Sequence, residues 1–151
     1  MNMCTLHKGD TIGLAAPSWL MTPEKAQPII DALTGMGYRC TPYTFTDTND
    51  VFSVTQTACA ASDVIFVPTD NTVATCSQVI RNVVDAEGTP IIGGDEGICS
   101  GCGVATLTIS YYDIGYATGL IAHEILERGA AVSQMPIEYA PIVTKQYNAA
   151  N

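Results

Sequence analysis

The sequence alternates short apolar runs with longer segments of helical periodicity, and this alternation restricts the chain to layered folds of strands and helices. The first apolar run covers residues 11–16 and stops at Pro17, and a later one, Val64–Val67, stops at Pro68. Runs that are apolar on both faces are typical of strands buried in a parallel sheet. Further strands are expected over residues 38–45, 90–93 and 104–109, with an edge or surface strand in the proline-containing tail over 137–147.

Apolar residues at helical spacing fill the segments between these runs. Thr22 and Pro23 predict the start of the first helix, because Thr is a common N-cap and Pro is tolerated at the first helical position. Gly37 can end that helix in the left-handed conformation. Asn49 or Asp50 is expected to cap the second helix and Asn71 or Thr72 the third, and a long helix is expected from Asp113 to Leu126.

Five strand–helix units in series predict an α/β fold: a three-layer, doubly wound parallel sheet with helices on both faces. The chain has 151 residues, the usual size of one domain, so we expect a single α/β domain over residues 1–151. The flavodoxin-like strand order 2-1-3-4-5 fits a compact chain of this length best. In such sheets ligands bind beyond the carboxyl ends of the strands, which selects the following loops as candidate sites.

Charge and hydropathy exclude several classes of partner. The 6 basic and 15 acidic side chains give a formal net charge of −9, so we expect neither nucleic acid nor an anionic membrane surface as a partner. No apolar stretch approaches the ~18–20 residues that span a bilayer, so we expect no membrane insertion. The opening residues lack the basic and apolar regions of a signal peptide, which predicts a cytoplasmic chain whose six cysteines are mostly reduced.

Polar residues gather in the loops that follow the predicted strands. Asp70 and Asp95 belong to two acidic loops, which could hold the ammonium group of a free amino acid while backbone N–H groups at helix starts hold its carboxylate. The same residue types are the usual N-caps of helices and would occur there without a ligand. The candidate ligand-binding residues are Ser18, Thr69, Asp70, Asn71, Asp95, Glu96, Ser110 and Tyr111.

Between residues 43 and 148 the sequence resembles a known family. The resemblance is carried by DVIFVPTDNT at 63–72, PIIGGDEG at 90–97, GYATG at 115–119 and MPIEYAP at 135–141. These segments are similar to the carboxyl-terminal lobe of an ABC transporter substrate-binding protein of the tryptophan/tyrosine kind, which has a type I periplasmic-binding fold. The resemblance implies an exported, extracytoplasmic family, candidate loops that face a cleft between two lobes, and a crossover into the other lobe near Ser110 and Tyr111.

The first segment resembles a different family. LHKGDTIGLAAPS at residues 6–18, together with the following helix and GMGY at 35–38, is similar to the opening of an LD-carboxypeptidase. We therefore expect a chimera in which residues 1–38 form a peptidase-like strand–helix unit, joined near residues 37–41 to a substrate-binding-protein lobe over residues 39–151. Both a natural fusion and an engineered one fit this pattern.

The sequence offers little support for catalysis. The LD-carboxypeptidase resemblance implies a Ser-Glu-His hydrolase, but Ser18 lies outside a Gly-x-Ser-x-Gly elbow, and neither His7 nor His123 is placed to activate it. Cys99 and Cys102 form a C-x-x-C motif, which supplies only two of the four ligands of a structural zinc site. We expect no enzyme activity, no metal and no cofactor; the alternative is a small hydrolase or thiol-redox protein of flavodoxin-like shape.

A single lobe limits both binding and assembly. Small-ligand sites usually bury ~70–90% of the ligand. One lobe covers less, so we expect at most a weak half-site for an aromatic amino acid, in the millimolar range or weaker, about −4 kcal/mol. The helix predicted over 113–126 has an apolar stripe that must cover its own sheet or another chain; it consists of Ile114, Ala117, Ile121, Ala122 and Ile125. We therefore expect either a monomer or a helix-swapped homodimer.

Overall fold

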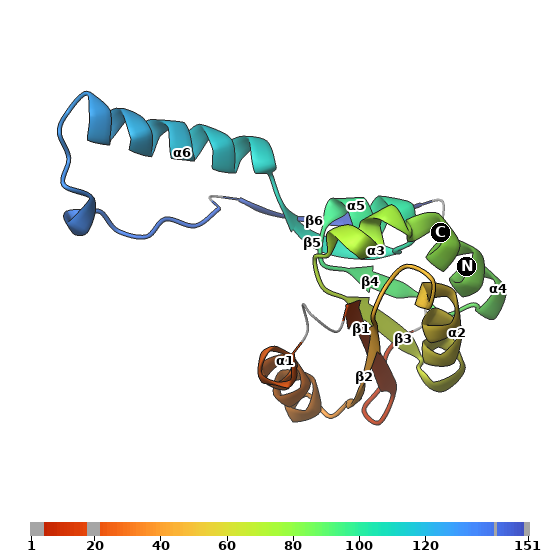
Figure 1. Cartoon of the computed structure of the whole chain (residues 1–151). Helices are drawn as coiled ribbons and strands as arrows, with labels where there is room; N and C mark the ends of the chain where they lie inside the picture. The colour runs from red at the N-terminus through yellow and green to blue at the C-terminus, as the bar shows by residue number, and fades with distance from the viewer. Residues whose placement is uncertain (1–4, 18–21, 141, 150–151) are drawn as a thin grey trace.

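The computed structural model describes residues 5–17, 22–140 and 142–149. Figure 1 shows a central sheet with helices packed against it and one long helix extending away. Among the described helices, none is long and apolar enough to cross a membrane. In chain order the elements are β1 (Thr11–Pro17), α1 (Pro23–Gly35), β2 (Arg39–Phe45), α2 (Val51–Ala61), β3 (Val64–Val67), α3 (Asn71–Thr75), α4 (Ser77–Glu87), β4 (Ile91–Gly93), α5 (Glu96–Gly101), β5 (Ala105–Ile109), α6 (Tyr111–Leu126), the 3-10 helix η1 (Val132–Gln134) and β6 (Val143–Tyr147).

The strands form one sheet in the order β2-β1-β3-β4-β5-β6. The pairs from β2 through β5 are parallel, and β6 pairs antiparallel with β5 at the edge. The predicted α/β class and the flavodoxin-like order of the first five strands are therefore confirmed. The carboxyl ends of the five parallel strands meet at one edge of the sheet, where the candidate loops follow β3, β4 and β5.

The opening strand lies inside the sheet. β1 pairs with β2 along its whole length and with β3 at Ile12, Gly13 and Leu14. Leu14 is 1% exposed and Ala16 is fully buried, so this strand contributes directly to the apolar interior.

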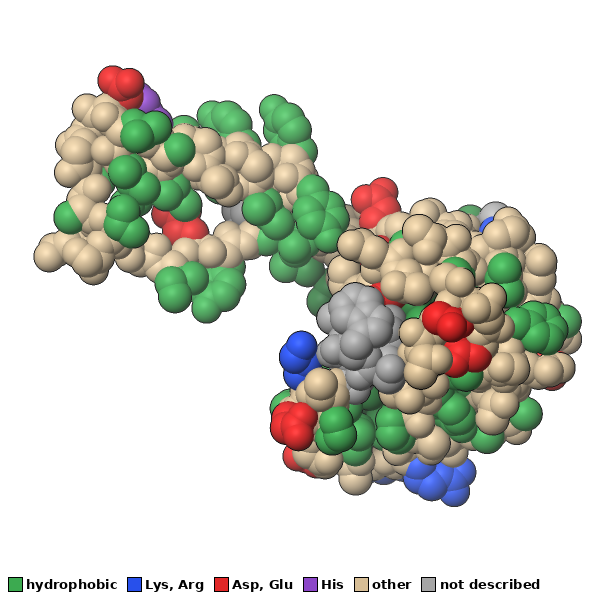
Figure 2. Space-filling view, in the orientation of Figure 1, with side chains coloured by type: hydrophobic (Ala, Val, Ile, Leu, Met, Phe, Trp, Pro, Cys, Tyr) green, Lys and Arg blue, Asp and Glu red, His purple; other side chains and the backbone are tan. Residues whose placement is uncertain are grey.

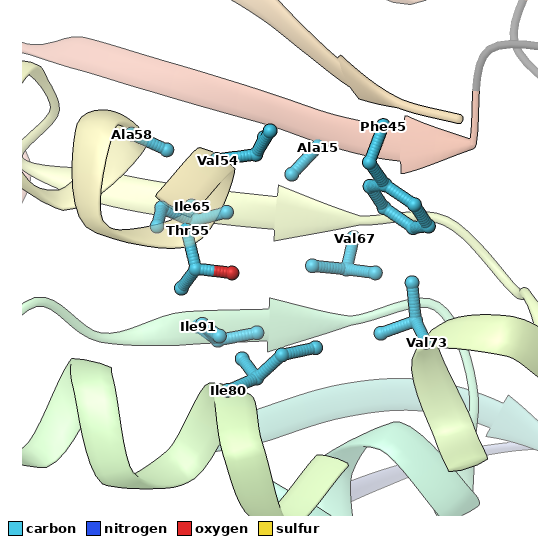
Figure 3. A pocket seen from close by; sticks show the side chains of 10 residues that line it. All are labelled: Ala15, Phe45, Val54, Thr55, Ala58, Ile65, Val67, Val73, Ile80 and Ile91. Carbon is cyan, nitrogen blue, oxygen red and sulfur yellow. The ribbon is translucent and has the colours of Figure 1, made fainter. Parts of the chain in front are cut away.

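The main core lies between the sheet and helices α2 to α5. Side chains alternate along a strand, so Ile65, Val67 and Ile91 share this face, and each is at most 2% exposed. Burying an aliphatic side chain of this size stabilises the fold by roughly 1.5–3 kcal/mol. Figure 3 shows these residues with Phe45 and Ile80 around a cavity of only about 20 Å³, so little space remains for a ligand inside the core.

Helix α6 does not cover the sheet from which it emerges. In Figure 1 it extends away from the sheet, and the chain returns through η1 and an extended segment to β6. No residue of α6 is buried, and Tyr112 and Tyr116 are 80% and 63% exposed. We refer to residues 110–140 as the arm.

Several helix limits differ from those expected. The helix expected from Asn71 or Thr72 is divided at Cys76, whose ψ of 6° interrupts the helix between α3 and α4. No helix is expected over Glu96–Gly101, because its six residues are too few to show helical periodicity. α6 begins two residues before Asp113, since the Ser110 hydroxyl accepts a hydrogen bond from the Asp113 N–H at 3.1 Å and caps the helix.

Candidate ligand-binding site at the carboxyl edge of the sheet

Backbone contacts hold together the two acidic loops at the carboxyl edge of the sheet. Gly94, which follows β4, donates its N–H to Val67 O at 2.7 Å, and the Thr69 hydroxyl donates to Gly94 O at 3.0 Å. A Cβ atom on Gly94 would lie 2.4 Å from the backbone N of Thr69, a distance that side chains do not tolerate. The loops that contain Asp70 and Asp95 therefore lie side by side.

Three of the candidate residues cap helices. Asp70 is 4% exposed, and its Oδ1 accepts a hydrogen bond from the Val73 N–H at 2.7 Å. Asp95 Oδ1 accepts from the Ile98 N–H at 2.9 Å, and Ser110 caps α6 as described. These contacts satisfy backbone donors that a helix leaves free at its start. The capping interpretation of these residues therefore holds, with or without a ligand.

The remaining described candidates are accessible from solvent. Thr69, Asn71 and Glu96 are exposed, and Tyr111 is 66% exposed at the start of α6. Asn71 and Glu96 are the first residues of α3 and α5, so they flank the two capped helix starts. The structure thus brings together the residues that follow β3 and β4. Ser18 lies outside the described residues.

Sequence reasoning missed Gly94, whose close approach to Thr69 sets the spacing of the two loops. The signal was present, because Gly93 and Gly94 form a glycine pair at the end of a strand, which indicates close passage of another backbone segment.

A further hollow in the described part of the molecule lies toward the amino end of β5, where Tyr147 of β6 pairs with Ala105. It has a volume of about 200 Å³ and lies between α5 and the end of β6. Glu96 is the one candidate residue on its wall, and the others are Cys99, Ser100, Gln146, Tyr147, Asn148 and Ala149. Neither this hollow nor the cavity in the core is lined by the other described residues of the two acidic loops, Thr69, Asp70, Asn71 and Asp95.

The C-x-x-C motif is buried and its thiols are protonated at neutral pH. Cys99 is 3% exposed in α5, and Cys102, 2% exposed, follows the helix. Burial raises the pKa of the Cys102 thiol to about 12, with a further contribution from Cys99, and burial also raises the pKa of Cys99. A reactive cysteine requires an accessible, stabilised thiolate. These properties give the thiol-redox alternative no support.

Neither histidine lies at the two acidic loops. His7 precedes β1, with its Nδ1 3.9 Å from Asp10 Oδ2, and His123 is exposed in the last turn of α6 on the arm. Within residues 5–17, 22–140 and 142–149, no group of three or more His, Cys, Asp or Glu side chains could hold a metal ion.

An α/β lobe with polar loops gathered at the carboxyl edge of a parallel sheet is the architecture of a ligand-binding module. The model of the family "ABC transporter substrate binding protein" matches residues 14–149, and the chain belongs to this family. The "Tyrosine-binding protein" of Clostridioides difficile (strain R20291) is 36% identical over 75 residues, which is 50% of this chain and 21% of that protein.

Solved structures share the fold. The ligand-free, open structure of a substrate binding protein with adhesive properties from Clostridium difficile has a TM-score of 0.77 and 25% identity, over 95% of this chain and 48% of that one. An ABC domain in complex with L-Trp from Streptococcus pneumonia has a TM-score of 0.75 and 21% identity, and the match covers 93% of this chain and 49% of that one. The chain therefore spans about half the length of these two solved structures.

The comparisons give no support to the expected chimera. The family match begins at residue 14 and continues through residues 37–41, where the junction was expected. Most of β1, from Leu14 onward, and most of the segment likened to an LD-carboxypeptidase thus fall within the match to the substrate-binding family. The short apolar strand, proline and amphipathic helix that suggested a peptidase are common to many α/β units.

Proposed function

We propose that this chain is a non-catalytic lobe of a solute-binding protein that forms one half of a site for a free aromatic amino acid. The observation that carries the proposal is the pair of acidic loops fixed side by side at the carboxyl edge, in a chain of the substrate-binding family. The similarity to a protein named for tyrosine binding favours an aromatic ligand.

Each group of an amino acid has a counterpart at this edge. Glu96, exposed at the start of α5, offers a carboxylate to the ligand ammonium group. Backbone N–H groups at the starts of α3 and α5 suit the ligand carboxylate, because helix starts carry partial positive charge. Thr69 and Asn71 add polar contacts, and the exposed ring of Tyr111 can stack on an aromatic side chain. Asp70, Asp95 and Ser110 hold the helix starts in place.

The open geometry sets the expected strength of binding. One lobe covers the ligand on one side only, whereas small-ligand sites usually bury ~70–90% of the ligand surface. We expect dissociation constants in the millimolar range or weaker, about −4 kcal/mol.

The test is a titration of the ¹⁵N-labelled chain with L-tryptophan, L-tyrosine and L-phenylalanine, followed by NMR. Amide shifts are expected at Asn71, Thr72, Glu96 and Gly97, with millimolar affinity. Glu96→Gln should weaken binding several-fold. The matched control is Glu87→Gln, in the last residue of α4, which should leave binding unchanged. Micromolar affinity for the isolated lobe would contradict the half-site, and absence of edge shifts with all three ligands would contradict the choice of ligand.

Membership of the family changes the proposed location. We place the lobe outside the cytoplasm, where substrate-binding proteins of ABC transporters work, in place of the cytoplasmic location expected from the opening residues. The chimeric origin is not part of the proposal, because the family match runs across the expected junction.

A further inference from the structure

The carboxyl end of α5 is held by a residue that comes after the arm. Asn148, which follows β6, donates from its side-chain Nδ2 to the backbone oxygens of Cys99 and Ser100 at 3.1 and 3.2 Å. Its backbone N–H donates to Val104 O at 2.8 Å. The last carbonyls of a helix lack partners within the helix, so the Asn148 amide serves as a cap that a distant segment supplies.

Close contacts fix the middle of α5 and one of its flanks. Ile98 is fully buried, and a Cβ atom on Gly93 of β4 would lie 3.0 Å from Ile98 Cγ2. A Cβ atom on Gly101 would lie 2.5 Å from the Cβ of Ser77, the first residue of α4. α5 therefore packs directly on β4 and against α4, and these two neighbours leave it little freedom to slide.

The other flank of α5 faces β6 and is joined to it by polar contacts. This flank borders the hollow of about 200 Å³, whose wall includes Ser100, Gln146 and Asn148. The position of Asn148 is set in turn by β6, because all five residues of that strand pair with β5. Figures 1 and 2 show the arm, which leads into β6, extending from this part of the sheet.

α5 is short enough that a shift at one end changes the direction of the other. Its six residues are about 9 Å long. Glu96 is its first residue, and the carbonyls that Asn148 holds belong to the fourth and fifth residues, about one turn away. Because Ile98 is fixed on the sheet between them, a displacement of the carboxyl end tilts α5 and redirects the Glu96 side chain.

We infer that Asn148 is a positioning residue for Glu96. Its side-chain amide sets the tilt of α5 according to the position of β6, and thereby makes the direction of the Glu96 carboxylate depend on the strand that completes the arm. The inference rests on the proposed function where it treats Glu96 as a ligand contact. The connection between Asn148 and α5 is measured without any ligand.

The first experiment is hydrogen exchange of the ligand-free Asn148→Asp variant, which keeps the size of the side chain and removes its donated N–H groups. The Cys102 and Gly103 amides donate to Ile98 O and Cys99 O at the end of α5. We expect both amides to exchange about tenfold faster in this variant. Asn148→Ala should have the same effect, because the missing donor and not the added charge is responsible.

Two controls separate positioning from a general loss of stability. The Gly88 amide, which donates to Val84 O at the end of α4, should keep its exchange rate in Asn148→Asp, while the chemical shift of the Glu96 amide should move. Gln146→Glu makes the same amide-to-carboxylate change two residues earlier and should leave α5 unchanged. Equal acceleration at Gly88, or unchanged exchange at Cys102 and Gly103, would overturn the inference.

The second experiment is the amino-acid titration. Asn148→Asp should raise the dissociation constant several-fold in the unmodified background and have no further effect in Glu96→Gln, because it acts through Glu96. An unchanged dissociation constant despite a loosened α5, or an equal effect in both backgrounds, would overturn the inference. A loosened α5 together with no binding by the unmodified chain would contradict the proposed function and still support the connection between Asn148 and α5.

Discussion

At the scale of single residues, Gly94 controls the distance between the two acidic loops. Replacement by alanine places a methyl group against the backbone of Pro68 and Thr69, which cannot move away as a side chain would. We expect Gly94→Ala to lower the free energy of unfolding by about 1–3 kcal/mol, measured by urea denaturation. Gly35→Ala, where an added Cβ meets nothing within 4 Å, is the control and should cost no stability.

The buried thiol of Cys102 makes stability depend on alkaline pH. Its pKa is raised from 9.0 to about 12 in the folded chain. Between these two values the unfolded chain loses a proton that the folded chain keeps, so this contribution to stability is complete below about pH 9 and is lost as the pH rises toward 12. Unfolding free energies measured from pH 8 to 11 should fall more steeply for the unmodified chain than for Cys102→Ala; equal slopes would contradict the assignment.

At the scale of elements, the caps determine whether the short helices at the candidate site form. α5 has only six residues, so the hydrogen bond that Asp95 Oδ1 accepts from the Ile98 N–H contributes much of the stability of this helix. We expect Asp95→Ala to destabilise the chain by about 1 kcal/mol and to speed hydrogen exchange at the Ile98 amide. Asp95→Asn keeps a good N-cap and should restore most of the protection; equal loss in both variants would mean that the charge, not the cap, is responsible.

The strands were predictable from sequence because their side chains reflect burial directly. Val64–Val67 is apolar throughout, as is typical of a central strand in a parallel sheet, and Pro68 marks its end; three of its four side chains are buried and Phe66 is half-buried. Asp70 and Asp95 were recognisable as possible N-caps by residue type alone, although no helix after Asp95 was predicted and the cap of the helix after β3 was expected one or two residues later. The break at Cys76 and the start of α5 were not predictable, since both depend on the contacts of a few residues, and a helix of five or six residues leaves no periodic signal.

At the scale of the whole molecule, the sequence indicates that α6 is a helix but not what its apolar face contacts. The predicted stripe is half-buried at Ile114, Ala117, Ile121 and Ile125 but exposed at Ala122. Tyr112 and Tyr116, which were not part of the predicted stripe, lie on an open face of the helix. Periodicity reports that a face is apolar and carries no information on which surface meets it. The same holds for the candidate site. The strand order predicts that the loops after β3 and β4 are neighbours, but it does not predict whether a ligand binds between them.

The antiparallel strand β6 has a consequence for how the protein is made. All five residues of β5 pair with β6, which comes at the far end of the arm. During synthesis β5 remains unpaired on this side until residues 143–147 have left the ribosome, and until then its backbone amides and carbonyls on that side lack partners. Such a strand recruits neighbouring polypeptides. A nascent or shortened product that stops before residue 143 should therefore aggregate and depend on chaperones, although every residue of the candidate loops is already present.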